Sequence, residues 1–139
     1  MPEPDLGPTL DRLGRDVPGL AAVYLFGSHG SAEARPGSDV DLAVLADRPL
    51  GPVERFDVQE RLAACLGRDV DLVDLRSAST VMQARIVSTG RVVLDADPGE
   101  RARFETVAYS AYALLNEERA GILADIAARG TVYGGSAHG

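Results

Sequence analysis

Two short motifs in the first third of the chain combine residue types suited to a metal ion and to a phosphorylated ligand. Gly27 and Ser28 follow the apolar run VYLF, and after nine further residues Ser38 introduces the run DVDLAVL, which begins with Asp39 and Asp41. Because side chains alternate between the faces of a strand, both carboxylates are expected on one face. Two such carboxylates repel each other unless a cation lies between them, and their oxygen atoms suit Mg²⁺.

The Gly-Ser pair predicts the second part of the same site. A turn at Gly27 lets backbone N–H groups come close to a ligand, and the hydroxyl group of Ser28 adds a further donor. Such groups favour an anion. A phosphate-binding turn opposite a metal-binding carboxylate pair indicates chemistry on a nucleoside triphosphate.

A third acidic residue is expected from the later segment DVDLVDL. Two-metal phosphoryl transfer needs carboxylates for both ions and a group that accepts the proton of the nucleophile. Asp71 would share the face of Asp39 and Asp41 if its strand lies beside theirs. Asp69 has the same parity and is the competing candidate. Asp74 has the opposite parity and is expected at the surface.

Alternating strands and helices must position these residues. The expected strands are residues 21–26, 39–45, 69–75 and 91–94, and the expected helices are a short one around Leu10, residues 52–67, residues 77–89 with a serine cap, and about residues 99–129 in one bent piece or two. The second helix would bury Phe56, Leu62 and Leu66. The apolar stripe of the last helix would consist of Phe104, Val107, Ala111, Leu114, Ile122 and Ile126. This order predicts an α/β fold.

A chain of 139 residues is expected to form one domain. Within it, we expect a core over residues 1–97 and a helical extension over residues 98–130 that packs on the same domain. Residues 131–139 have the composition of a flexible tail. The sequence contains no internal repeat.

Composition excludes several classes of function. The net charge of −7 should repel nucleic acid, which argues against a polymerase or a tRNA-tailing enzyme. The single cysteine, Cys65, excludes an internal disulfide and a cysteine-based zinc site, and it is expected to be buried. The N-terminal sequence MPEPDLGP is unlike a signal peptide, and no apolar run approaches the length of a membrane span. We therefore expect a cytoplasmic protein without a membrane partner.

With GS-x9-SDVDL and the later VDLVDL, the chain resembles the DNA polymerase β-type nucleotidyltransferases. Its length and C-terminal helices are most similar to the minimal nucleotidyltransferase (MNT) proteins. The segment LDADPGERARFETVAYSAYALLNEER also resembles the C-terminal part of the MNT antitoxins that are paired with HEPN ribonuclease toxins. The resemblance spans most of residues 20–120, and the first motif is its most specific part.

This resemblance implies an α/β (α+β) palm fold with a mixed sheet of about four or five strands, ATP as the substrate and two Mg²⁺ ions. The implied site residues are Asp39, Asp41 and Asp71 for metal binding and catalysis, and Gly27, Ser28, Arg35 and Ser38 for the nucleotide. Family members transfer AMP from ATP to an acceptor hydroxyl group and release pyrophosphate. In the MNT antitoxins the acceptor is a tyrosine of the HEPN toxin, whose RNase activity is silenced.

The chain departs from the family pattern directly after Gly27 and Ser28. Many relatives carry a sequence like R-A-R-G there, whereas this chain has His29-Gly30-Ser31-Ala32. Two arginines that could hold a triphosphate are therefore absent, and His29 is a poorer cation near neutral pH. Arg35 is the remaining candidate for a phosphate contact in this segment, and an exposed position in a loop is the alternative.

Two alternatives to a toxin-modifying enzyme remain. A catalytically weak MNT protein could neutralise its toxin by binding alone. A small-molecule nucleotidyltransferase of the aminoglycoside-modifying type is disfavoured, because such enzymes resemble this core with a substantial substrate domain added.

Overall fold

The computed structural model describes residues 6–27 and 39–132, and the side chains of these residues up to residue 128. Its elements are α1 (Gly7–Asp16), β1 (Leu20–Phe26), β2 (Val40–Ala46), α2 (Pro52–Leu66), β3 (Val70–Asp74), the 3-10 turn η2 (Leu75–Ser77), α3 (Thr80–Thr89), β4 (Arg91–Asp95) and α4 (Pro98–Val132). In this part of the chain, the strands and the α-helices follow one another in the predicted order.

The sheet is mixed and has the strand order β3-β2-β1-β4 within the described residues. β1 pairs antiparallel with both β2 and β4, whereas β2 and β3 are parallel. Parallel neighbours need a crossover connection, and α2 provides it. The predicted α/β fold with a mixed sheet is confirmed.

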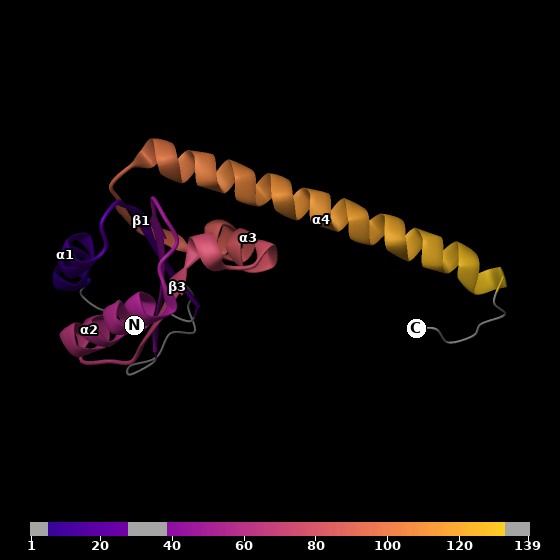
Figure 1. Cartoon of the computed structure of the whole chain (residues 1–139). Helices are drawn as coiled ribbons and strands as arrows, with labels where there is room; N and C mark the ends of the chain where they lie inside the picture. The colour runs from indigo at the N-terminus through magenta and orange to yellow at the C-terminus, as the bar shows by residue number, and fades with distance from the viewer. Residues whose placement is uncertain (1–5, 28–38, 133–139) are drawn as a thin grey trace.

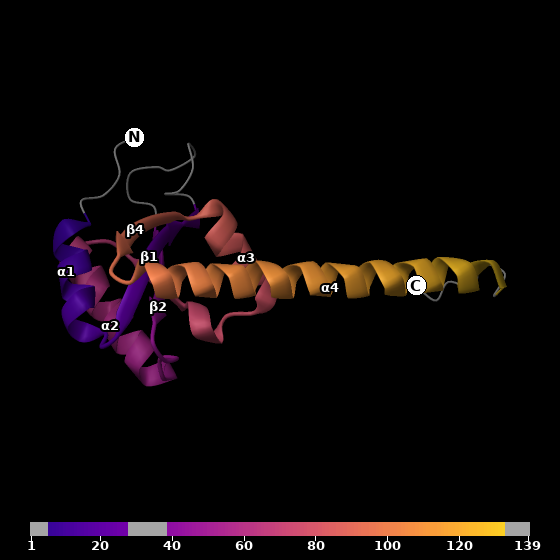
Figure 2. The same cartoon turned by 90° about the horizontal axis from the view of Figure 1, so that it is seen from above.

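Helices cover both faces of the sheet (Figures 1 and 2). The side chains of β2 project alternately from the two faces of the sheet. On one face, Val40, Leu42 and Val44 pack with α1 and α2. On the other, Ala43 and Leu45 pack with α3 and α4. All five side chains are fully buried. The centre of the sheet is therefore dry on both faces, and only its ends can present polar side chains to solvent.

The outer edge of β3 is held by side chains of α2. Gln59 accepts a hydrogen bond from the backbone N–H of Leu72 at 2.9 Å, and Arg55 donates one to the carbonyl oxygen of Leu72 at 3.0 Å. Both backbone groups would otherwise lie unpaired at the sheet edge. These contacts hold the strand segment that carries Asp71.

Asp74 is buried, so its expected position at the surface was wrong. Only 5% of the residue is exposed, and its carboxylate accepts hydrogen bonds from the N–H of Leu50 at 2.9 Å, the N–H of Arg76 at 3.2 Å and the hydroxyl group of Ser77 at 2.7 Å. Asp74 does lie on the face of β3 opposite to Asp71, as its parity predicts. At this point, however, the loop before α2 covers that face. Asp74 thus joins the end of β3 to the start of α2.

α4 is one continuous helix that extends well beyond the sheet (Figure 1). Its first turns are anchored by polar contacts: buried Tyr24 donates a hydrogen bond to Glu105 at 2.5 Å, and Arg101 pairs with both Glu105 and Asp95. Burial, together with the Glu105 carboxylate, raises the pKa of Tyr24. Arg76 adds an ion pair with Glu100 at 2.7 Å.

The predicted apolar stripe of this helix is only partly correct. Phe104 and Ala108 are buried, whereas Val107, Leu114 and Ile122 are more than half exposed. Helical periodicity marks a face, but the face is buried only where the body of the protein reaches it. Beyond that point the stripe continues into solvent.

Three smaller expectations also need correction. Phe56 is 52% exposed, and Val58 with Leu62 forms the fully buried part of α2. Ser79 caps α3 by accepting a hydrogen bond from the N–H of Met82, so the helix begins two residues later than a Ser77 cap would place it. Cys65 is exposed.

No helix in the described ranges is long and apolar enough to cross a membrane.

Replacing Asp74 by alanine should lower the free energy of unfolding by about 2–3 kcal/mol, because the buried N–H of Leu50 loses its partner. Urea denaturation followed by circular dichroism measures this. Asp74→Asn keeps an acceptor oxygen and should lose less. Asp57→Ala, at an exposed position of α2, is the control and should stay within about 0.5 kcal/mol of the unmodified chain. Equal stability of Asp74→Ala and Asp57→Ala would contradict this role.

Candidate active site

Asp41 and Asp71 are direct neighbours on adjacent strands. Their Cα atoms are register partners in the parallel pairing of β2 with β3. Side chains at paired positions project from the same face, here the face that α3 covers further along the strands. The predicted placement of Asp71 beside Asp41 is therefore found, although both roles remain predictions.

Two more carboxylates border this pair. Asp39 directly precedes β2 and is exposed, as is Asp71, whereas Asp41 is half-buried. Asp69 precedes β3, and its carbonyl oxygen accepts a hydrogen bond from the N–H of Val40 at 2.9 Å. By strand alternation Asp39 and Asp69 share the face of Asp41 and Asp71. The structure thus keeps both Asp69 and Asp71 as candidates for the third acid.

Gly27 lies against this acidic end of the sheet. It directly follows β1, whose last residue, Phe26, is the register partner of Asp41. The backbone of Gly27 has φ +72°, and a Cβ atom placed on it would collide with Oδ2 of Asp41. Glycine is needed here for its conformation and also because the Asp41 carboxylate fills the space of a side chain. The sequence predicted close approach to a ligand, and the structure adds this second reason.

The other predicted nucleotide contacts, Ser28, Arg35 and Ser38, lie outside the described residues, and so does His29. Among residues 6–27 and 39–132, no three acidic, histidine or cysteine side chains converge as a ready metal site. The donor set still fits Mg²⁺, since it consists of carboxylates gathered on one face at the solvent-exposed end of a sheet. Asp39, Asp41 and Asp71 are the residues that would hold the ion.

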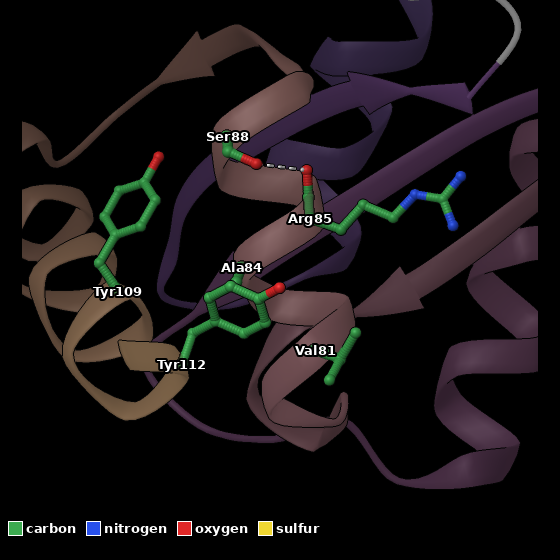
Figure 3. Close-up of a pocket in the computed structure, with 6 residues that line it drawn as sticks. All are labelled: Val81, Ala84, Arg85, Ser88, Tyr109 and Tyr112. Carbon is green, nitrogen blue, oxygen red and sulfur yellow. Dashed lines mark hydrogen bonds between the residues drawn. The ribbon is translucent and has the colours of Figure 1, made fainter. Parts of the chain in front are cut away.

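A groove of about 430 Å³ lies between α3 and α4 (Figure 3). Val81, Ala84, Arg85 and Ser88 line it from α3, and Tyr109 and Tyr112 line it from α4. Sequence reasoning did not anticipate the groove, because it depends on how the two helices cross.

Residues 10–99, which contain all four described strands, match the family model described as polymerase beta, nucleotidyltransferase. The chain belongs to this nucleotidyltransferase family, and it is a nucleotidyltransferase. The protein adenylyltransferase MntA of Shewanella oneidensis is 39% identical over 113 residues, which cover 81% of each chain.

Solved structures agree with this assignment. A chain in the crystal structure of a toxin–antitoxin with AMP-PNP is 35% identical and superposes with a TM-score of 0.78, covering 88% of this chain and 98% of its own. A chain in the structure of a tri-AMPylated Shewanella oneidensis HEPN toxin in complex with MNT antitoxin is 35% identical, with a TM-score of 0.71 and coverage of 86% and 92%. The predicted nucleotidyltransferase fold is confirmed.

Gly27→Ala should disturb the site beyond its effect on stability. Gly67, with φ +68° and open space around its Cβ position, provides a matched control. Both alanine variants should lose about 1–2 kcal/mol of stability to backbone strain. Only Gly27→Ala displaces the Asp41 carboxylate, so only this variant should bind Mn²⁺, used as a probe in place of Mg²⁺, at least about tenfold more weakly in calorimetric titration. Equal Mn²⁺ binding by both variants would contradict the assigned contact.

Proposed function

We propose that this nucleotidyltransferase transfers AMP from ATP to the hydroxyl group of a tyrosine in a partner HEPN ribonuclease toxin, and so acts as the antitoxin. The observation that carries the proposal is the pairing of Asp41 with Asp71 at the end of the sheet where Gly27 lies. The similarity to an adenylyltransferase and to chains solved with AMP-PNP and with an AMPylated HEPN toxin supports it. We place the reaction in the cytoplasm, where ATP is supplied.

The proposed reaction exchanges a phosphoanhydride bond of ATP for a phosphoester bond to the acceptor. The acceptor oxygen bonds to the α-phosphorus of ATP while the bond from that phosphorus to the bridging oxygen breaks, and the electron pair leaves with pyrophosphate. Asp71, exposed at the rim, would take the proton of the acceptor hydroxyl group. Asp39 and Asp41, together with Asp71, would hold Mg²⁺, which when bound offsets the charge of the triphosphate. Gly27 and Ser28 would hold the phosphate tail.

The shape of α4 supports a protein acceptor. The face through which Phe104 and Ala108 pack on the body continues along the helix to Ile122 and Ile126, which are 59% and 45% exposed. Every described side chain from residue 116 to residue 128 is exposed. A protein partner that covers this continuing face would bury apolar surface that the chain itself leaves open.

The carboxylates should be essential for transfer but not for folding. Asp39→Asn and Asp41→Asn should abolish the mass gain of AMP units on the co-expressed toxin, measured by intact-protein mass spectrometry with ATP and Mg²⁺. Because each change removes a repelling charge, the melting temperature without Mg²⁺ should stay equal or rise by a few degrees. Asp57→Asn is the control on α2. Normal transfer by both site variants would exclude their assigned role.

The same variants separate the enzyme from an antitoxin that acts by binding alone. If modification silences the toxin, an Asp39→Asn/Asp41→Asn double variant should form the complex yet leave the RNase active once the complex dissociates. Full and lasting inhibition by the double variant, without ATP, would favour neutralisation by binding.

The apolar face of α4 gives a test of the partner. Ile122→Glu places a charge on the face that continues the core, and Ala124→Glu places the same charge about 200° around the helix. The first variant should weaken toxin binding in calorimetry by about tenfold or more, since a carboxylate would be buried in the interface. The second should bind like the unmodified chain. Equal affinities would exclude this face as the docking surface.

A further inference from the structure

Arg85 lies on α3, at the edge of the groove that this helix forms with α4. In Figure 3 its side chain extends away from Tyr109 and Tyr112, toward the side on which the ribbon of β1 ends. The residue is exposed, and no carboxylate among the described residues forms an ion pair with it. Its charge is thus available to a ligand.

α3 lies on the same face of the sheet as the acids. Ile86, which follows Arg85, is fully buried and packs with Ala43 and Leu45. These two residues lie on the same face of β2 as Asp41. At the end of the helix, a Cβ atom placed on Gly90 would be 3.4 Å from the carbonyl oxygen of Leu25 and 3.5 Å from Phe26. α3 therefore ends directly over the last residues of β1.

A chain of neighbouring residues connects the end of α3, and with it Arg85, to the acids. Phe26, beneath the end of α3, is the register partner of Asp41, and Asp41 is the register partner of Asp71. Arg85 precedes Gly90 by five residues, about 7.5 Å along the helix axis at 1.5 Å per residue. A long side chain that leaves the helix toward β2 and β3 can reach a ligand held over these acids.

Several other arginines form ion pairs elsewhere in the structure. The chain contains no lysine, so every strong cation is an arginine. Ion pairs are formed by Arg12 with Asp16, Arg48 with Glu54, Arg76 with Glu100, Arg101 with Asp95 and Arg103 with Glu100. Arg85 differs because it stands on the acidic face without such a partner among the described residues.

We propose that Arg85 binds the β- and γ-phosphates of the nucleotide and so supplies a cation that the segment His29-Gly30-Ser31-Ala32 lacks. This inference rests on the proposed function, because it takes ATP as the substrate. A triphosphate placed beside several carboxylates needs positive charge from the protein as well as from Mg²⁺. A guanidinium group is always protonated and can donate two parallel hydrogen bonds to phosphate oxygens.

The test compares nucleotides that do and do not carry the outer phosphates. Arg85→Ala should bind AMP-PNP, with Mg²⁺ present, about ten- to a hundredfold more weakly in calorimetric titration, while its affinity for AMP stays unchanged. Arg85→Lys should fall between the two, because it keeps the charge but loses the paired hydrogen bonds. Arg12→Ala, on α1 at the opposite face, is the matched control and should bind both nucleotides normally.

Each outcome has a defined meaning. An equal loss of affinity for AMP and AMP-PNP would show a structural role, and unchanged affinity for both would likewise overturn the inference. Transfer assays then separate this inference from the proposed function. If the unmodified chain binds AMP-PNP in an Arg85-dependent way but adds no AMP to the toxin, the proposed function fails and the role of Arg85 stands. A chain that binds no AMP-PNP would overturn both.

Discussion

The parallel pairing of β2 with β3 is the constraint on which the site depends. It sets Asp41 beside Asp71 at a spacing fixed by the strands, so the two carboxylates cannot move apart without breaking the ladder. Like charges at this spacing repel, and a bound cation would offset that repulsion. The contacts of Gln59 and Arg55 to β3, and those of Asp74 at its end, hold this strand in place and so keep Asp71 beside Asp41.

The strands and the local placement of the acids could be predicted from the sequence because they depend on short-range patterns. The alternation in DVDLAVL and DVDLVDL fixes which side chains share a face, whatever the sheet order. That β2 and β3 lie side by side could be predicted only from the family resemblance. The burial of Asp74 could not be foreseen, since its partner Leu50 lies 24 residues earlier, although the hydrogen bonds to Arg76 and Ser77 follow a local capping pattern.

Long-range packing explains the other differences. Phe104 and Leu114 belong to the same periodic pattern, yet the first is 8% exposed and the second 56%, because the body of the protein ends between them. Arg85 could not be predicted as a site residue for a related reason. A single arginine in the run MQARIV forms no recognisable motif, and its relation to the site depends on where the helix packs on the sheet. The acids were found through spacing along the chain, whereas their cationic counterpart comes from a helix that begins after the third strand.

The free half of α4 has a consequence for how a complex would form. From residue 116 onward its helical state rests on its own backbone hydrogen bonds and on local side-chain pairs, and isolated helices of this length are marginally stable in water. Docking would then couple two equilibria, recognition of the partner and completion of the helix. The ordering cost offsets part of the interface energy, so a large contact area can coexist with ready dissociation. An antitoxin built this way could release a modified partner and act on another.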